Sequence, residues 1–387
     1  MRELPRMPMV AAPLVAVLAG RESTLRADVL DVLRCRQSVL RALEERGYRG
    51  IPLDIYPRDL QNRGKGLLKK LEKLNPSCIF NLFEGFSFDA SSEILICSLL
   101  ERSGIPFTGN GSRPLELCLD KDKAKRRLAA AGLPVPRGYS LKKGQRRTAP
   151  SLNYPLFLKP QHQDGSLGIR ERSLVRTPQE LERNAALLLE EFPEGILVEE
   201  FLSGAEYSVA FMGNREYRPL GVSVICYEGG EFSFLNYDSK WTPESREFRE
   251  IAVLPESHVL PQVKELLFSL AARAGRSLGC RGYFRVDFRE QGGIPHIIDV
   301  NPNPDINEDS GFVRQCGERS ISYEDLVEQL VILGMKEGEG HLYGFRASRK
   351  MYGHGGKYRS LSERGDYGTP GSVGGLLGNV GGLQTSR

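Results

Sequence analysis

The sequence contains no long hydrophobic run: nothing in its 387 residues approaches the stretch of about 18 uninterrupted apolar residues that a membrane-spanning helix requires. The start, MRELPRMPMVAAPLVAVLAG, does place arginines ahead of an apolar segment, as a secretory signal peptide does. Two prolines interrupt that segment, and we interpret its end, residues 14–19, as the buried first strand of a globular domain. A signal peptide is the alternative interpretation.

The cysteine spacings that are typical of zinc sites and of disulfide frameworks are also absent. The seven cysteines are odd in number and scattered, without a CxxC pair or a nearby histidine that would complete a zinc site; they stand at positions 35, 78, 97, 118, 226, 280 and 316. This usage is typical of a reducing compartment, and we therefore expect the protein in the cytoplasm.

Neither sign of charge dominates, because 53 Lys and Arg stand against 49 Asp and Glu, a formal net charge of +4. The balance predicts no polyanionic partner, so neither a nucleic acid nor a membrane surface is expected to bind. The densest basic cluster, KDKAKRR at residues 121–127, contains an acid and no aromatic residue. We interpret it as the solvated face of a helix, with nucleic-acid binding as the alternative.

The first part of the chain alternates strand-like and helix-like segments, which predicts a parallel α/β domain over residues 1–116. The dinucleotide motif G-x-G-x-x-G is missing, since AGREST follows the first predicted strand. The predicted strands cover residues 14–19, 51–55, 77–83 and 105–109, and the predicted helices residues 25–47, 57–73 and 91–103.

The remainder is predicted to form two further units and a tail. A smaller β-rich unit, residues 117–204, would hold a helix at 121–132, a strand at 154–159, a glycine loop, a helix at 178–192 and a strand at 196–201. Residues 205–337 would add several strands, helices at 259–277 and 323–335, and a hairpin. The last fifty residues contain 14 glycines and few apolar side chains, so residues 338–387 are predicted to be a disordered tail.

The hairpin is the most informative segment. In YFRVDFR, residues 283–289, apolar and polar side chains alternate, and in IIDVN, residues 297–301, Ile298 and Val300 would share one face while Asp299 and Asn301 take the other. A turn centred on Gly293 places Asp287 opposite Asp299.

Two carboxylates at cross-strand distance repel each other unless a cation lies between them, and oxygen ligands select a hard ion such as magnesium. The alternative is an exposed hairpin face whose aspartates pair with Arg285 and Arg289. The abrupt end of the strand at NPNPD favours the ion site, to which Asn301 would add a neutral oxygen.

Two segments indicate a phosphate and nucleotide site. A predicted strand ends at Lys159, and the following loop contains Gly165, Ser166 and Gly168, whose backbone N–H groups would approach phosphate oxygens. The apolar strand ILVEEFL ends in adjacent carboxylates, with Glu206 a few residues later, and such acids need polar partners such as an adenine amino group and ribose hydroxyls. A hairpin turn and a solvated strand end are the respective alternatives.

Four motifs, KPxxxxGSxGI, VEEFLSGAE, FRVDF and IDVNPNP, together resemble those of ATP-grasp enzymes in order and spacing, most closely the D-alanine–D-alanine ligase branch, over about residues 115–335. The resemblance implies a two-lobed ATP-grasp domain and an ADP-forming ligase that uses ATP and two magnesium ions, with manganese as a substitute. It implies nucleotide contacts by Lys121, Lys159, Gly165, Glu199, Glu200, Leu202 and Glu206.

The same resemblance implies the reacting groups. Lys240, in YDSK, would reach the terminal phosphate, Arg285 would stabilise the developing oxyanion, and Ser166 would belong to the loop over the phosphates. Asp287, Asp299 and Asn301 would bind the metal ions, although the family usually has glutamate at the position of Asp299.

The acceptor half departs from the family. D-alanine–D-alanine ligases carry a GGxSxE-type turn and an HG…GEDG segment that contact the first amino acid, and this chain has AGREST and NLFEGFSFD, with Glu22 and Glu84 as partial substitutes at most. We therefore predict a carboxylate–amine ligase of undetermined substrates that acts through an acyl phosphate. Its partners would be a small carboxylate and a small amine, amino acids in the first place, and the assembly a homodimer. D-alanine–D-alanine ligase itself and an ATP-binding protein without turnover are the alternatives.

Overall fold

The computed structural model describes residues 12–22, 27–86, 89, 91–145, 151–227, 234–235 and 251–351, and of residues 27–29 and 338–351 only the backbone. Contacts divide the chain into two units, Met1–Gly344 and Phe345–Arg387. Of the second unit, only the helical backbone of residues 345–351 is described, so the fold below is that of the first.

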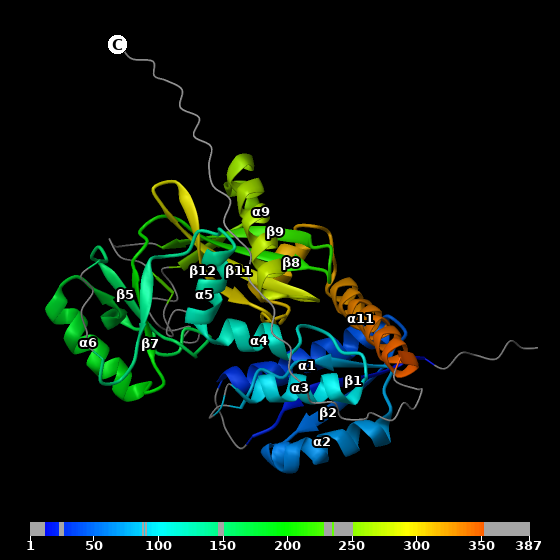
Figure 1. The fold of residues 1–387 in the computed structure, drawn as a ribbon. Coiled ribbons are helices and arrows are strands. Elements are labelled where there is room, and N and C mark those ends of the chain that lie inside the picture. The colour runs from blue at the N-terminus through cyan, green and yellow to red at the C-terminus, as the bar shows by residue number, and fades with distance from the viewer. Residues whose placement is uncertain are drawn as a thin grey trace, which may run out of the picture. The chain divides into compact units, whose positions relative to one another are not determined.

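The N-terminal part is built on a parallel sheet of order β2-β1-β3, formed by β1 (Leu14–Gly20), β2 (Arg49–Ile55) and β3 (Cys78–Asn81) (Figure 1). Strand β1 is buried on both faces, which explains its unbroken apolar sequence. Val15 and Val17 pack with helices α1 (Ala27–Glu45) and α11 (Tyr323–Met351), and Ala16 and Leu18 with α2 (Gln61–Leu74) and α3 (Ser92–Ser103). The predicted parallel α/β fold is thereby confirmed.

Two predictions about element lengths are wrong. The strand expected at residues 105–109 is a single bridge between Ile79 and Phe107, because Pro106 has no N–H group to donate to a ladder. Helix α11 continues to Met351, past the expected start of the tail at residue 338, since KEGEGHLYGFRASRKM contains enough helix-forming residues to extend it despite three glycines. Residues 352–387 of the predicted tail lie outside the described part of the chain.

The second sheet has the order β4-β7-β5-β6 and consists of β4 (Gly138–Leu141), β5 (Leu156–Pro160), β6 (Leu174–Val175) and β7 (Ile196–Glu200). All its pairings are antiparallel. Helix α6 (Pro178–Glu191) covers one face, where its Leu181 and Leu188 contact the cluster that contains Leu158 and Val198. The opposite face of β5 and β7 is thus left to present polar residues such as Lys159 and Glu199.

The third sheet is antiparallel, with the order β10-β9-β8-β11-β12. Its strands are β8 (Glu206–Met212), β9 (Arg218–Tyr227), β10 (Ile251–Leu254), β11 (Tyr283–Gln291) and β12 (Ile294–Asn301). Phe284, Val286 and Phe288 of β11 are fully buried in a cluster with helix α9 (Pro261–Leu278). The alternation of β11 therefore fixes which of its residues face the opposite way.

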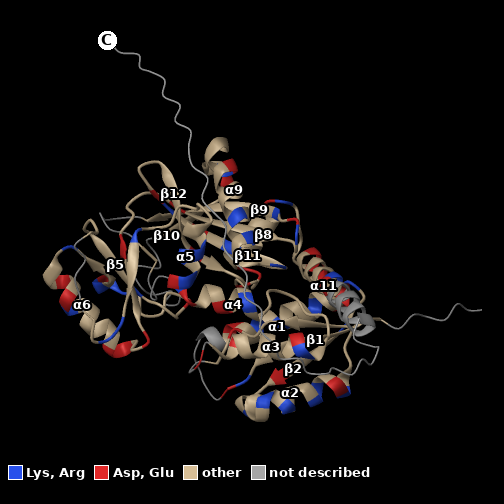
Figure 2. Ribbon diagram, viewed as in Figure 1, with Lys and Arg blue, Asp and Glu red and all other residues tan. Residues whose placement is uncertain are grey.

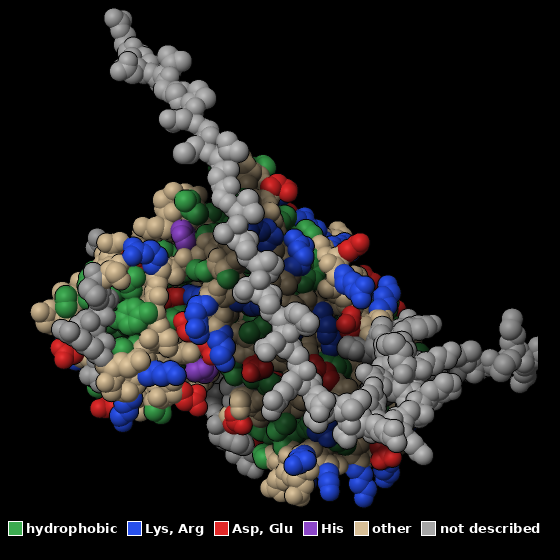
Figure 3. Space-filling view, in the orientation of Figure 1, with side chains coloured by type: hydrophobic (Ala, Val, Ile, Leu, Met, Phe, Trp, Pro, Cys, Tyr) green, Lys and Arg blue, Asp and Glu red, His purple; other side chains and the backbone are tan. Residues whose placement is uncertain are grey.

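Short helices join these sheets. They are α4 (Ser112–Leu119), α5 (Lys121–Ala130) and α10 (Gly311–Gly317), with single 3₁₀ turns at Pro57–Leu60, Glu171–Ser173 and Glu256–His258. Helix α2 carries mainly basic and α6 mainly acidic side chains (Figure 2), and the visible face of the molecule shows both signs of charge (Figure 3). Among the described residues no helix has the length and apolar character that crossing a membrane demands. The unit boundaries expected at residues 116, 204 and 337 stay a prediction.

Asn110 joins the N-terminal part to the hairpin strands. Its side chain is completely buried, donates from Nδ2 to the carbonyl oxygens of Tyr283 (2.8 Å) and Pro302, and accepts from the Arg281 N–H at 2.7 Å. Its own N–H donates to Asn303 Oδ1 at 2.8 Å. One amide thus fixes the start of β11 and the segment after β12 to the loop that precedes α4.

Asn110→Ala should lower the free energy of unfolding by about 3 kcal/mol, because three side-chain hydrogen bonds of roughly 1 kcal/mol each are lost and their buried partners stay unsatisfied. Urea denaturation followed by circular dichroism measures this. Asn153→Ala, at an exposed amide, is the control and should change the value by less than about 0.5 kcal/mol. Equal effects in both variants would show that Asn110 is not a structural node.

Candidate active site

A cavity of about 1150 Å³ lies between the three sheets. Its walls include every site residue predicted from the sequence that falls within the described ranges: Lys121, Lys159, Gly165, Ser166, Glu199, Glu200, Leu202, Glu206, Arg285, Asp287, Asp299 and Asn301. Glu22 and Glu84 line it as well. Lys240 lies outside the described residues. The fold therefore brings together residues that are up to 180 positions apart, from Lys121 to Asn301.

The hairpin of β11 and β12 has the predicted register at its open end, with Asp287 opposite Asp299 and Arg285 opposite Asn301. Gly292 and Gly293 both have positive φ, 58° and 79°, as a two-residue hairpin turn requires.

A β-bulge follows Asp287, so that Phe288 pairs with Ile297 and Ile298 is the extra residue. The prediction that Ile298 and Val300 share a face is therefore wrong. Ile297 and Val300 are in the core, whereas Ile298 lines the cavity.

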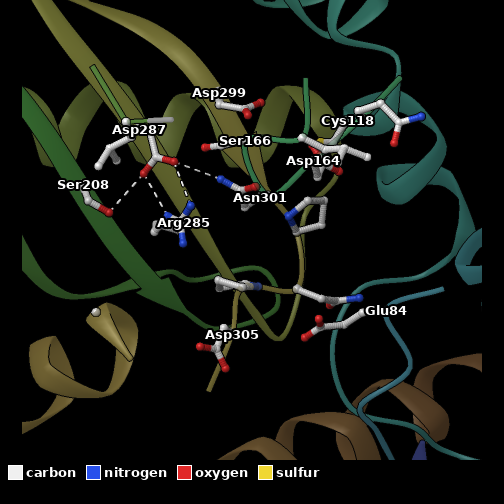
Figure 4. Close-up of a pocket in the computed structure, with 18 of the residues that line it drawn as sticks. Glu84, Cys118, Asp164, Ser166, Ser208, Arg285, Asp287, Asp299, Asn301 and Asp305 are labelled. Carbon is white, nitrogen blue, oxygen red and sulfur yellow. Dashed lines mark hydrogen bonds and ion pairs between the residues drawn. The ribbon is translucent and has the colours of Figure 1, made fainter. Parts of the chain in front are cut away.

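Asp287 is held by four hydrogen bonds (Figure 4). Its Oδ1 accepts from Arg285 Nε at 2.8 Å and Ser208 Oγ at 3.0 Å, and its Oδ2 accepts from Arg285 Nη2 at 2.9 Å and Asn301 Nδ2 at 3.0 Å. Burial lowers the pKa of Arg285, but Asp287 outweighs burial and raises that pKa above its ordinary value. The Arg285 guanidinium is therefore charged at neutral pH.

Lys121 joins Asp299 to the glycine loop. Its Nζ lies 3.1 Å from Asp299 Oδ2 and 2.5 Å from Asp164 Oδ1. Burial raises the pKa of Asp299, but Lys121 and Lys159 outweigh it and hold that pKa below its ordinary value. Each aspartate of the hairpin is thus neutralised by its own cation, Arg285 on Asp287 and Lys121 on Asp299.

Glu199 lies buried between two lysines. Lys159 Nζ is 3.2 Å from Glu199 Oε2, and Lys125 forms an ion pair with Glu199 Oε1. Burial, with Lys159 nearby, lowers the pKa of Lys125 to about 7. Lys159 also donates to the carbonyl of Ile298 at 3.1 Å, which is the residue that the bulge removes from regular pairing.

Lys125 was not predicted as a site residue. The interpretation of residues 121–127 as a solvated face is correct for Lys123, Arg126 and Arg127, which are exposed. It is wrong for Lys121 and Lys125, which are buried. Lys121 and Lys125 are one helical turn apart, and together with Ala124 and Leu128 they form the buried face of α5. The four-residue spacing between Lys121 and Lys125 was the feature of the sequence from which a buried Lys125 could have been predicted.

The loop after β5 adopts a conformation that favours glycine. Gly165, Ser166 and Gly168 have φ values of 63°, 63° and 79°. At Gly168 a Cβ atom would lie 2.6 Å from side-chain atoms of Phe192 and Pro160, so no other residue fits there. The loop places Asp164 against Lys121 and Ser166 on the cavity wall.

The far end of the cavity is apolar and aromatic. Phe157 of β5, Phe201 after β7 and Phe234 form mutual ring contacts, with centroids 5.0 to 6.5 Å apart. The N–H groups of Glu200 and Phe201 donate to the carbonyls of Arg137 (2.9 Å) and Pro155 (3.0 Å), so neither can donate to a ligand. The Glu200 side chain turns toward Arg137. A flat heterocycle bound at this end would contact the three phenylalanine rings and the Glu199 carboxylate.

The opposite end is rich in carboxylates, among them Asp31, Glu93 and Asp305, which sequence reasoning did not identify. Glu84 and Asp305 lie on the other side of the Arg285–Asp287 pair from Asp299 in Figure 4. Burial raises the pKa of Glu93 to about 7, against a hydrogen bond that Asn303 Nδ2 donates at 3.0 Å and that lowers it. These residues surround the region that departs from the family in sequence.

The oxygen donors of the hairpin suit magnesium. Asp287, Asp299 and Asn301 offer two carboxylates and one amide oxygen, and no nitrogen or sulfur ligand lies among them, which suits a hard cation. The guanidinium on Asp287 marks a position where positive charge is stabilised. Within the described ranges no cluster of three or more His, Cys, Asp or Glu side chains is arranged around a cation site.

An N-terminal α/β part, followed by two antiparallel sheets that enclose a cavity lined by lysines and carboxylates, is the architecture of the ATP-grasp class. A family model described as D-ala D-ala ligase C-terminus matches residues 128–332. The chain is similar to a D-alanine–D-alanine ligase from Desulforudis audaxviator, with 31% identity over 313 residues that cover 79% of this chain and 94% of the relative.

Two further comparisons agree. An uncharacterized protein of Sinorhizobium fredii is 28% identical over 309 residues, 77% of this chain and 86% of that one. A crystal structure of D-alanine–D-alanine ligase from Bacillus anthracis complexed with ATP superimposes with a TM-score of 0.68 at 19% identity, covering 85% of this chain and 100% of that chain. The chain belongs to the D-alanine–D-alanine ligase family of ADP-forming carboxylate–amine ligases.

Glu199→Gln should lower the free energy of unfolding by about 3 kcal/mol, because it removes the buried carboxylate that pairs with both Lys125 and Lys159. Urea denaturation at neutral pH measures this. Glu191→Gln removes a half-exposed carboxylate that pairs with Arg170 and Arg172, and should cost less than about 1 kcal/mol. Losses of equal size would mean that the lysine–glutamate cluster does not contribute to stability as its burial implies.

Proposed function

We propose that the protein is an ATP-dependent ligase that joins a small carboxylate to a small amine through an acyl phosphate. The convergence of Lys121, Lys159 and Arg285 on the two hairpin aspartates in one cavity carries the proposal. Such a grouping suits a reaction between anions, which requires neutralisation of charge more than it requires an acid or a base.

The chemistry proceeds in two steps. An oxygen of the substrate carboxylate attacks the terminal phosphorus of ATP, and the bond to ADP breaks. The amine nitrogen then attacks the carbonyl carbon of the acyl phosphate, inorganic phosphate leaves, and the nitrogen loses a proton. Lys121 and Lys159, supported by Lys240, would neutralise the phosphates, while Arg285 would stabilise the oxyanion and the loop at Gly165 and Ser166 would cover the transferred group.

Asp287, Asp299 and Asn301 would hold the magnesium ions, which supply further neutralisation of the phosphate charge. A cation on Asp287 would compete with Arg285, since the guanidinium donates to both carboxylate oxygens. The shorter side chain of Asp299, where the family usually has glutamate, reaches less far but retains the carboxylate. The ion site and its occupancy are thus part of the proposal.

The nucleotide would bind at the aromatic end of the cavity. The rings of Phe157, Phe201 and Phe234 suit a purine, Glu199 would accept from its amino group, and the backbone near Leu202 would complete the contact. Glu206 would accept hydrogen bonds from the ribose hydroxyls. A crystal structure of this fold complexed with ATP supports the use of ATP.

The names of the relatives favour amino acids as substrates, and D-alanine is therefore one candidate. Two features favour a different pair of substrates: the carboxylate-rich wall around Glu84, Glu93 and Asp305, and the replaced segments AGREST and NLFEGFSFD.

We further propose a cytoplasmic homodimer. The seven free thiols support a reducing compartment, and analytical ultracentrifugation tests the assembly.

When the protein is incubated with ATP, magnesium and amino acids, offered singly and in pairs, at least one combination should lead to the release of ADP and phosphate. A coupled ADP assay and mass spectrometry of the product measure this. Turnover with D-alanine alone would identify a D-alanine–D-alanine ligase, and substrate-independent binding of ATP with no turnover on any pair would contradict the ligase assignment.

Asp287→Asn should reduce kcat by at least about 100-fold while the protein remains folded, because a neutral amide replaces the carboxylate expected to hold the cation. ADP release at saturating ATP and magnesium measures this. Asp122→Asn, on the outer side of α5 beside Arg126, is the control and should keep full activity. Normal turnover of the Asp287 variant would remove the hairpin from the proposed metal site.

A further inference from the structure

Arg289 is the third polar residue on the cavity face of β11, after Arg285 and Asp287. It lies directly opposite Glu206 of β8, and both side chains are buried, with 7% and 6% of their surface exposed. Arg289 Nη1 is 3.4 Å from Glu206 Oε2, and Tyr227 Oη donates to the same oxygen at 2.7 Å. The carboxylate that we assign to the ribose is thus held by a charged and a neutral donor.

Aromatic rings fix the guanidinium itself. Its Cζ lies 4.7 Å from the centroid of the Phe201 ring and 5.7 Å from that of Tyr227, both within the range of a cation–π interaction. Phe201 follows β7, whereas Tyr227 ends β9. Arg289 therefore links the Glu206 carboxylate to the aromatic wall at the nucleotide end, through Phe201 beside the second sheet and Tyr227 in the third.

We propose that Arg289 is a positioning residue that makes this site specific for a ribonucleotide, by holding the Glu206 carboxylate oriented toward the vicinal hydroxyls of the ribose. The inference rests on the proposed function, since it requires the nucleoside at this end. A 2′-deoxyribose offers the carboxylate one hydroxyl fewer, and a carboxylate in the wrong orientation would lose its contact with either sugar. Discrimination between the two sugars then depends on the orientation of Glu206, and so on Arg289.

Arginine supplies both a charge and a stacked plane at this position. Its planar guanidinium can stack on Phe201 and Tyr227 while one nitrogen meets Glu206, whereas a lysine would supply the charge without the stacked plane. Lysine at this position should therefore preserve much of the affinity for the nucleotide, and methionine, which keeps the apolar length, should preserve little.

The test is isothermal titration calorimetry of ATP and of 2′-deoxy-ATP, with magnesium and without carboxylate or amine, on the wild type, Arg289→Met, Arg289→Lys and Glu206→Gln. The wild type should bind ATP about tenfold more tightly than 2′-deoxy-ATP, which is about 1.4 kcal/mol. Arg289→Met and Glu206→Gln should bind ATP about tenfold more weakly, with the ratio of the two nucleotides reduced to about 2 or less. Arg289→Lys should stay within about threefold of the wild type for ATP.

Steady-state kinetics add a second measurement. The KM for ATP of Arg289→Met should rise in step with the dissociation constant while kcat changes less than about twofold, because the residue lies at the nucleoside end and not beside the transferred group. Arg276→Met is the matched control: Arg276 of α9 lies 5.9 Å from the Tyr217 ring and outside the cavity wall, and its loss should change neither value.

An Arg289→Met protein that keeps both the affinity and the nucleotide ratio of the wild type overturns the inference. If that variant does not fold, an unchanged ratio in Glu206→Gln overturns the inference equally, because Arg289 is argued to act on the sugar only through that carboxylate. A wild type that binds the two nucleotides with the same affinity contradicts the inference and leaves the ligase function standing. A wild type that binds neither nucleotide contradicts the proposed function itself.

Discussion

Two carboxylates that face each other across a hairpin must be neutralised, and much of this structure follows from that requirement. Asp287 and Asp299 are cross-strand partners at the buried end of β11 and β12. Arg285 neutralises the first from the same strand, and Lys121 neutralises the second from α5. Because the two cations come from different elements, the position of α5 and of the loop that contains Asp164 is linked to the hairpin.

The register of the hairpin could be predicted from the sequence, because period-2 alternation and a pair of glycines in the turn determine which residues are opposite. The parallel α/β part was predictable for a similar reason, since a strand buried on both faces is apolar throughout. The bulge at Ile298 could not be predicted. Alternation in IIDVN is consistent with either face for the first isoleucine, and only the packing against α9 decides that Ile297 enters the core.

The site residues that could not be identified from the sequence are those whose partners come from distant elements. Lys125 is 74 positions from Glu199, and Arg289 is 83 positions from Glu206. Nothing local distinguishes a lysine that pairs with a buried glutamate from one in a solvated cluster, although the helical spacing to Lys121 was a clue. Glu93 was missed because its significance depends on Asn303, far along the chain. Motifs thus located the cavity, whereas the pairings inside it required the fold.

The contact of Asp164 with Lys121 has a consequence for how a nucleotide enters. A carboxylate of the glycine loop pairs with the ammonium group that we assign to the phosphates. A phosphate that binds there would exchange one anion for another on Lys121. Because Asp164 and Asp299 both pair with Lys121, this buried lysine does not depend on a nucleotide for its counter-charge.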